Sequence, residues 1–154
     1  MDHTDVPVAL EYLDESECWQ LLAQEPVGRV GVIFDSGPEV YPVNHRVDGG
    51  TIIFRTDRGS KLEALAKTPS VCYEVDGLDP VRRTGWSVLV KGRASEVGPE
   101  EADSDALRLL DLWSVGPKAH GIRITPTEVT GRRTYRYGHT AEEVRSDDTP
   151  ADGQ

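Results

Sequence analysis

Short stretches of alternating apolar and polar residues, separated by tight turns, most limit how this chain can fold. The turn Asp48-Gly-Gly-Thr51 lies between two such stretches, and a Gly-Gly pair in that position is typical of a β-hairpin. Strands joined by turns this short pair antiparallel. A doubly wound parallel sheet would need regular alternation of strands and helices, and the sequence pattern does not show it.

The pattern predicts six strands and three helices. The strands are expected over residues 27–34, 39–47, 52–56, 70–76, 86–97 and 122–132, and the helices over about 14–25, a short segment from Ser60, and 99–113. Residues 77–83 are expected to form a loop. Because helices are few among these antiparallel strands, we predict a mainly β fold in which the sheet closes into a small barrel.

Three local signals refine these elements. Asp14 followed by Glu17 predicts a capping box at the first helix. Ser60 followed by Glu63 predicts that Ser60 is the N-cap of the second helix. Pro42 lacks an N–H group, so it marks a sheet edge, a bulge or the opening of a strand.

The length of 154 residues fits one domain, since single cores hold about 100–200 residues. We place this domain at residues 13–137, between an acidic N-terminal arm at 1–12 and an acidic C-terminal tail at 138–154. Residues 1–17 carry six acids and no base, residues 140–154 five acids and one base, and residues 18–139 sixteen of each. The ends are expected to be solvated, and the neutral remainder offers no broad basic surface for nucleic acid.

The sequence also allows expectations about the cellular compartment and about metal sites. No apolar run approaches the roughly 18 residues of a membrane helix, and the start of the chain lacks the cationic and apolar regions of a signal peptide. We therefore expect a cytoplasmic protein without membrane contact. The two cysteines and four histidines are scattered, so neither a metal site nor a disulfide is expected.

The segment from Arg55 to Lys61 joins the end of a predicted strand to the start of a predicted helix. Helix N-termini present unpaired N–H groups, and they bind phosphate readily where a nearby glycine lets the backbone approach. Arg55 and Lys61 add positive charge, and Thr56 and Ser60 add hydroxyl groups. Together these residues have the composition of an anion-binding site.

The same segment has an ordinary structural interpretation. Ser60 would only cap the helix, while Arg55 and Lys61 would be solvated surface charges. Asp57 and Glu63 would repel a phosphate at close range. These residues alone leave both interpretations open.

A longer series of motifs runs in order from about Leu13 to Arg133. It comprises Pro42-Val-Asn44, Asp48-Gly-Gly50, Phe54-Arg-Thr56, Gly59-Ser-Lys61, Glu74-Val-Asp76, Gly85-Trp-Ser-Val-Leu-Val-Lys-Gly-Arg93 and Val129-Thr-Gly-Arg-Arg133. The series resembles the pyridoxamine 5′-phosphate oxidase-like family, and within it the short flavin-binding split-barrel proteins common in actinobacteria. The resemblance implies an antiparallel, FMN-binding split barrel.

The resemblance also implies a binding site and a partner. In that family a homodimer binds FMN at the subunit interface. Carried over, the phosphate would be held by Arg55, Thr56, Ser60 and Lys61, the isoalloxazine ring would lie along Pro42, Val43 and Asn44, and Trp86, Ser87 and Val88 would border the same cleft. For Trp86, a place in the core or in the dimer interface is the structural alternative.

The expected function is that of an FMN-dependent oxidoreductase acting on a small molecule. No catalytic side chain is assigned, because in flavin enzymes the cofactor carries the redox chemistry. The family includes members that use the deazaflavin F420, which is one alternative. A flavin-binding module without turnover is another, and so is a dimeric scaffold without a ligand. Vitamin B6 oxidation is not expected, because the chain ends through Arg136-Tyr-Gly-His139 into an acidic tail rather than in a substrate-phosphate motif that pairs arginine with histidine.

Overall fold

Seven strands and three helices make up the part of the chain that this computed structural model describes, residues 8–57, 59–102 and 120–136. In chain order they are β1 (Val8–Leu13), α1 (Glu15–Gln24), β2 (Val27–Phe34), β3 (Gly37–Asp48), β4 (Thr51–Thr56), α2 (Ser60–Lys67), β5 (Ser70–Asp79), β6 (Thr84–Glu96), α3 (Pro99–Ala102) and β7 (His120–Arg136). None of the described helices is long and apolar enough to cross a membrane.

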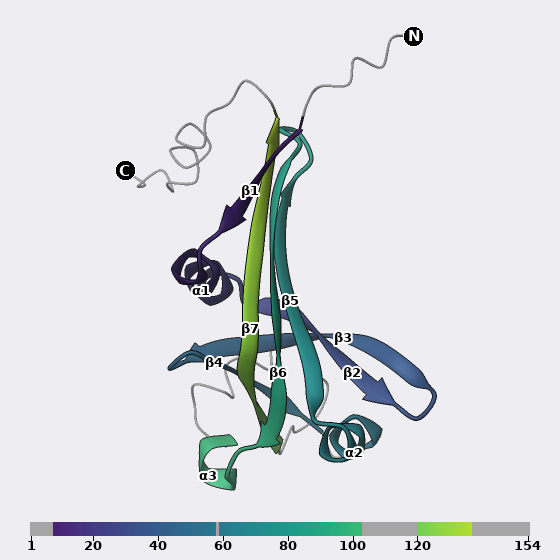
Figure 1. Ribbon diagram of the computed structural model, residues 1–154. Coiled ribbons are helices and arrows are strands. Elements are labelled where there is room, and N and C mark those ends of the chain that lie inside the picture. Colours follow the sequence, from purple (N-terminus) through teal and green to yellow (C-terminus); the bar gives the residue numbers. More distant parts are fainter. Residues whose placement is uncertain (1–7, 58, 103–119, 137–154) are drawn as a thin grey trace.

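The strands form one antiparallel sheet in the order β1-β7-β4-β3-β2-β5-β6. β7 pairs with β6 as well, so six strands form a ring, and β1 is attached to the outside of β7. Figure 1 shows β5, β6 and β7 continuing beyond the ring as a long arm, with β1 along it. The predicted mainly β, antiparallel barrel is confirmed.

A bulge in β7 lets this strand serve both the ring and the arm. Lys91 of β6 lies opposite Glu128, but the next residue, Gly92, lies opposite Pro126. Thr127 is therefore the extra residue of a β-bulge, and its Oγ1 donates a hydrogen bond to the Lys91 carbonyl at 3.1 Å.

The extra residue reverses which positions of β7 face the core. Before the bulge the even-numbered Ile122 and Ile124 are buried. After it the odd-numbered Val129 packs against the core and Gly131 is buried. Side chains alternate along a strand, so only an inserted residue can shift the inward positions from even to odd.

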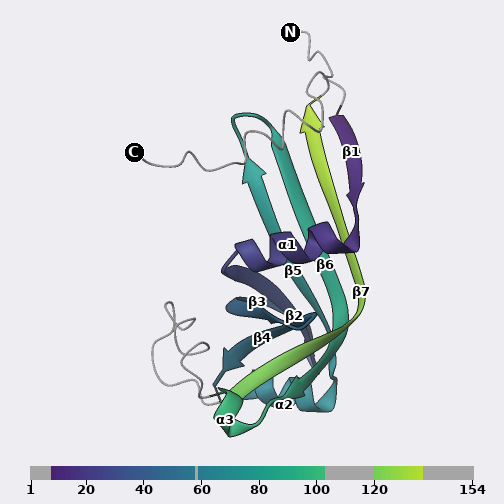
Figure 2. The same ribbon diagram turned by 90° about the vertical axis from the view of Figure 1, so that its left-hand side faces the viewer.

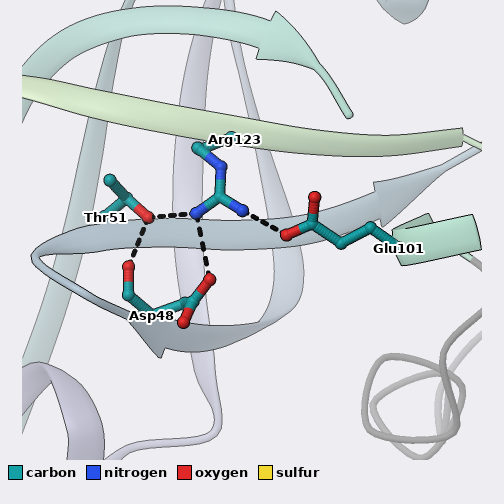
Figure 3. Close-up of polar contacts among 4 residues, drawn as sticks. All are labelled: Asp48, Thr51, Glu101 and Arg123. Atoms are coloured by element: carbon teal, nitrogen blue, oxygen red, sulfur yellow. Dashed lines mark hydrogen bonds and ion pairs between the residues drawn. The ribbon is translucent and has the colours of Figure 1, made fainter. Parts of the chain in front are cut away.

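Arg123 of β7 ties the β3–β4 hairpin to α3 (Figure 3). Its Nη1 lies 3.1 Å from Asp48 Oδ2 and 2.6 Å from Thr51 Oγ1, and its Nη2 bonds to the Glu101 carboxylate. The predicted turn between Asp48 and Thr51 is confirmed. Both of its central glycines have positive φ angles, 54° and 74°, as a type I′ hairpin turn requires.

α1 begins with the predicted capping box, in which Glu17 N–H donates to Asp14 Oδ1 at 2.8 Å and Asp14 N–H donates to Glu17 Oε2 at 3.3 Å. Figure 2 shows this helix lying across the strands between the arm and β2–β4. Cys18 and Leu22 are its fully buried residues. Cys18 packs so closely on β7 that a Cβ on Gly131 would lie 2.6 Å from its Sγ.

A buried polar bridge connects α1, β3 and β5 inside the ring. His45 Nε2 lies 2.7 Å from the Leu22 carbonyl oxygen, and Nδ1 lies 2.5 Å from the Tyr73 hydroxyl. The carbonyl can only accept, so Nε2–H donates to it, and Nδ1 accepts from the Tyr73 O–H. Burial lowers the pKa of His45, which keeps the imidazole neutral in this bridge. Tyr73 fits only because residue 28 is glycine, since a Cβ there would lie 2.3 Å from its hydroxyl oxygen.

The structure differs from the sequence-based expectation in three segments: β1, the turn between β5 and β6, and the chain after α3. The sequence assigns residues 8–12 to a solvated acidic arm, whereas they pair with β7 as β1. The loop expected over 77–83 is shorter, because β5 runs to Asp79 and β6 begins at Thr84. Asp79 Oδ1 accepts hydrogen bonds from the N–H groups of Val81 and Arg82, which stabilises a tight turn instead. Beyond Ala102, the helix expected to residue 113 lies outside the described residues.

Replacing Gly92 with alanine should destabilise the fold by about 1–3 kcal/mol, the usual range for overpacking. The new Cβ would lie 2.4 Å from the Thr125 carbonyl oxygen and 3.0 Å from Pro126 Cα, and neither backbone atom can rotate away. Chemical denaturation measures the effect. Gly98→Ala is the matched control, because a Cβ at that position has nothing within 4 Å. Equal unfolding midpoints for the two variants would contradict the packing described at the bulge.

The neutral state of His45 should make stability fall with acidity. Its pKa is lowered in the folded state, so below about pH 6.5, the ordinary histidine value, the unfolded chain binds more protons and folding weakens. At pH 7.5, His45→Leu should cost about 1–3 kcal/mol, because leucine can neither donate to the Leu22 carbonyl nor accept from the Tyr73 hydroxyl and so leaves both buried groups unsatisfied. The free energy of unfolding should be measured over about pH 5–8, a range that brackets the histidine reference pKa of about 6.5. The difference in this free energy between wild type and variant should shrink toward about pH 5. A difference independent of pH would argue against a neutral bridge.

Candidate functional site

The end of β4 and the start of α2 carry the residues that the sequence analysis considers for an anion site. Arg55 and Thr56 are buried, with exposed fractions of 9% and 3%, whereas Ser60 is exposed and Lys61 is half-buried. The backbone hydrogen bond that opens α2 runs from Glu63 N–H to the Gly59 carbonyl at 3.1 Å. The N–H groups before it have no partner within the helix, which is the general property that makes helix starts bind anions.

The prediction that Ser60 caps α2 is wrong. The N-cap is Gly59, which offers no side chain to accept a hydrogen bond from the helix, and Ser60 is the first helical residue. The backbone at Gly59 is extended, with φ 160° and ψ -163°. The Ser60 hydroxyl therefore lies at the helix start without serving as its cap.

Lys61 connects this helix start to β3. Its Nζ lies 4.3 Å from the centroid of the Tyr41 ring, a cation–π contact. Tyr41 directly precedes Pro42, the first of the residues expected along the isoalloxazine ring. The structure thus brings the segment expected to hold the phosphate into contact with the strand expected to carry the ring.

β3 has an open edge at these residues. Over Gly37 to Asn44 it pairs with β2, and only from His45 onward does it pair with β4. On the side away from β2, no strand of the described chain is paired with residues 37–44. Pro42 lies in this one-sided stretch, which confirms the prediction of an edge position. The backbone here is able to hydrogen-bond a planar ligand lying along the strand.

Alternation divides the predicted ligand-binding side chains between the two faces of the sheet. Val43 and Val88 belong to the core, and Val88 is fully buried. Pro42 and Asn44, which flank Val43, point to the opposite face, called here the outer face. Arg55 shares the outer face with Asn44, because the paired residues His45 and Phe54 both point inward.

The predicted group Trp86, Ser87 and Val88 is divided in the same way. Trp86 is half-buried against the core, with its indole so close to Gly77 that a Cβ there would lie 2.5 Å from Nε1. Ser87 alone points to the outer face, between Asp76 and Arg132 on the neighbouring strands. Of the three side chains, Ser87 is therefore the one that lies on the same face as Pro42 and Asn44.

The outer face also carries an ionic cluster that the sequence analysis did not assign to the site. Arg29 Nη1 lies 3.3 Å from Glu74 Oε2 and 3.5 Å from Asp76 Oδ2. Arg29 pairs with Pro42 across β2–β3, and Asp76 pairs with Ser87 across β5–β6. The Glu-Val-Asp spacing is the sequence signal, since it places both carboxylates on one face of a strand.

Glu74 is protonated more easily than an ordinary carboxyl group. Its pKa is raised from 4.5 to about 7, most strongly by burial and then by the hydrogen bond and charge of Asp76, while Arg29 acts in the opposite direction. A carboxyl group with this pKa exchanges its proton near neutral pH. Groups of this kind are frequent at functional sites.

Arg46 is a second residue that the sequence analysis did not assign. It lies two residues beyond Asn44 on the outer face, opposite the fully buried Ile53, which in turn pairs with Arg123. The Nε of Arg46 is buried and has no hydrogen-bond partner among the described residues. A buried guanidinium donor without a partner fits a place for an acceptor such as an anion.

The described residues show no cluster with the composition of a metal site. Two clefts lie beside the candidate residues. One, of about 460 Å³, is bounded by α2 and the β2–β3 turn and includes Ser60. The other, of about 300 Å³, lies between the C-terminal end of α1 and β3 and includes His45 and Arg46.

Known proteins share both this sequence pattern and this fold. The family described as pyridoxamine 5'-phosphate oxidase matches residues 14–133. The uncharacterized protein Rv0080 of Mycobacterium tuberculosis is 40% identical over 126 residues, which cover 79% of this chain and 83% of that protein.

Two solved structures, both described as FAD-binding proteins, resemble the fold. The one from Mycobacterium smegmatis is 34% identical with a TM-score of 0.62, and the match covers 81% of this chain and 98% of that one. The one from Mesorhizobium loti has a TM-score of 0.75 at 24% identity, over 84% of this chain and 100% of that one. The ring of strands, the ordered motifs and the family match over residues 14–133 agree, and the chain belongs to the pyridoxamine 5'-phosphate oxidase-like family.

Proposed function

We propose that this protein binds a flavin nucleotide, FMN or FAD, with a phosphate at the start of α2 and the ring system along the open edge of β3. The observation that carries the proposal is the contact between Lys61 and the Tyr41 ring, 4.3 Å from Nζ to the centroid. It joins a helix start suited to phosphate to a strand edge suited to a planar ring. The FAD-binding relative from Mycobacterium smegmatis, 34% identical to this chain, supports the same ligand class.

The residues present fit such a ligand. Positive charge comes from Arg55 and Lys61, and Thr56 and Ser60 supply hydroxyl donors. The unpartnered Nε of Arg46 adds a donor on the outer face. Val88 and Trp86 would act through packing or backbone rather than by side-chain contact from that face, because both lie against the core.

We further propose that the protein is an oxidoreductase acting on a small molecule. A bound flavin supplies the redox chemistry, and the protein supplies position and electrostatics. Glu74 would hold or release a proton at its carboxylate oxygens, since its pKa is raised to about 7 and it lies on the same face as Pro42 and Ser87. A flavin-binding module without turnover and an F420-dependent reductase are the alternatives.

A homodimer is part of this proposal. The outer face of the arm carries exposed apolar side chains on three strands, namely Leu10 and Tyr12 of β1, Leu78 of β5 and Leu89 of β6. The strand register makes Tyr12 a cross-strand neighbour of Arg132, which is followed across the sheet by Ser87 and Asp76. A second copy covering this face would bury apolar surface next to the proposed ligand residues.

Lys61→Gln should weaken FMN binding about tenfold or more and leave riboflavin binding nearly unchanged, because a charge-assisted bond to phosphate contributes about 1.5–3 kcal/mol. Lys61 is preferable to Arg55 here, since Arg55 is buried and its loss would also disturb the fold. Isothermal titration with both ligands gives the two affinities. Lys67→Gln, at the opposite end of the same helix, is the control and should change neither. An equal loss for FMN and riboflavin would remove Lys61 from the phosphate site.

Reduction of the bound flavin tests the proposed oxidoreductase activity. Protein loaded with FMN or FAD should lose its yellow flavin absorbance when NADPH or NADH is added without oxygen, and air should restore it. A yellow protein that neither donor reduces would support the binding module. A protein that takes up F420 but neither flavin would support the deazaflavin alternative, and one that takes up none of them would refute the proposal.

A further inference from the structure

The cleft of about 300 Å³ at the end of α1 lies on the opposite edge of β3 from the proposed flavin ring. The ring is placed along residues 37–44, on the side of β3 away from β2. This cleft instead opens on the β2 side, beyond the last paired residue Asn44, where Pro26 and Val47 line it. Its volume is at the lower end of the roughly 300–1,000 Å³ of small-ligand sites, so the cleft suits a small molecule.

The floor of this cleft is apolar, and its buried polar groups are already paired. Leu22 is fully buried and His45 is 3% exposed. His45 Nε2–H donates to the Leu22 carbonyl at 2.7 Å, so both groups are satisfied within the protein. Ala23, Pro26 and Val47 add apolar surface around this floor. The cleft therefore favours a ligand with an aliphatic part.

The end of α1 gives one wall of the cleft hydrogen-bond acceptors. The last carbonyl groups of a helix have no partner within the helix, and they carry the negative end of its dipole. No hydrogen bond between described residues reaches the carbonyls of Ala23 and Gln24. The last turn has no basic side chain, and Glu25 adds a carboxylate to the same wall. This wall suits a cationic group that carries N–H donors.

β3 gives the other wall hydrogen-bond donors. His45 N–H donates to the Pro26 carbonyl at 3.1 Å, so the backbone polar groups of His45 point toward the β2 side. Those of Val47, two residues on, point the same way, where the pairing with β2 has ended. Arg46 lines the same cleft, and its Nε is buried without a hydrogen-bond partner among the described residues. A carboxylate is the strongest acceptor for such a donor.

Glu25 and Arg46 line one cleft without pairing with each other. Within the part of the chain that the structure describes, neither side chain takes part in an ion pair. A ligand with a single charge would complement only one of them and would face a like charge on the other wall. A ligand that carries both charges complements both walls.

We propose that this cleft binds a free aliphatic α-amino acid. The carboxylate of the ligand lies against Arg46 and the Val47 N–H, its ammonium group against Glu25 and the carbonyls at the end of α1, and its side chain against the apolar floor. This site does not rest on the proposed flavin function. It assigns Arg46 to the amino acid rather than to a flavin on the outer face.

Titration of the full chain, without added flavin, with three matched ligands tests this inference. The ligands are L-leucine, isocaproate, which lacks the ammonium group, and isoamylamine, which lacks the carboxylate. NMR chemical shifts measure weak as well as tight binding, and the amide signals of Gln24 and Val47 report on the cleft. Leucine should shift these signals with a dissociation constant of about 1 mM or lower, at least about tenfold below that of either analogue.

Two variants should change the ligand preference in opposite ways. Arg46→Gln should weaken leucine and isocaproate binding about tenfold and leave isoamylamine binding unchanged, because only the carboxylate loses its partner. Glu25→Gln should weaken leucine and isoamylamine binding and leave isocaproate binding unchanged. Arg93→Gln, at an exposed position of β6 outside the cleft, is the control and should change none of the three.

A pair of tryptophan variants tests the location without altering either charge. Ala23→Trp, at an exposed position that lines the cleft, should block all three ligands. Ser16→Trp, at an exposed position near the other end of the same helix, should block none of them.

Several results would overturn the amino-acid site and leave the proposed flavin function untouched. These are the absence of leucine binding at millimolar concentration, equal affinity for the three ligands, and leucine binding that survives Ala23→Trp. Loss of all three ligands by the same factor in Arg46→Gln and Glu25→Gln would also overturn it. So would an Arg46→Gln variant that binds FMN more weakly but leucine as before, because the side chain would then belong to the flavin. Leucine binding as described, in a protein that takes up no flavin, would support this site and refute the proposed function.

Discussion

The rest of the structure depends on the point where β3 changes partner. Up to Asn44 the strand pairs with β2, and from His45 it pairs with β4, so this one strand links two parts of the ring. The buried bridge from Leu22 through His45 to Tyr73 lies at this point and connects α1 and β5 to β3. Because the partners change here, Pro42 and Asn44 keep one side without a strand, and the candidate site exists only for that reason.

Much of the fold could be predicted because its signals are local. The glycine pair after Asp48, the capping box at Asp14 and the alternation of the strands all act over a few residues. β1 could not be predicted, since its pairing with β7 joins residues more than a hundred positions apart and its own segment leaves Leu10 and Tyr12 exposed. The N-cap of α2 was mispredicted because serine is a frequent cap, but here the helix begins one residue earlier, at Ser60, and the extended Gly59 precedes it.

For the candidate site, too, the residue types could be predicted from the sequence, whereas the contacts between them could not. The sequence could name phosphate-binding residue types at Arg55 and Lys61, but not the contact of Lys61 with Tyr41, which needs the tertiary fold. It grouped Ser87 with Val88, although alternation places them on opposite faces. The cluster of Arg29, Glu74 and Asp76 spans two strands that are distant in sequence, and its raised carboxyl pKa arises from burial that only the assembled sheet provides.

The bulge at Thr127 restricts insertions and deletions in β7 among chains of this family. The ring requires Ile122 and Ile124 inside, and the arm requires Val129 and Gly131 inside, so the two halves of β7 are out of phase by one residue. Deleting that one residue would turn every side chain of the arm strand to the wrong face, while removing two would preserve the phase. Homologous chains should therefore gain or lose residues between these halves in even numbers, or else carry the compensating change in β6.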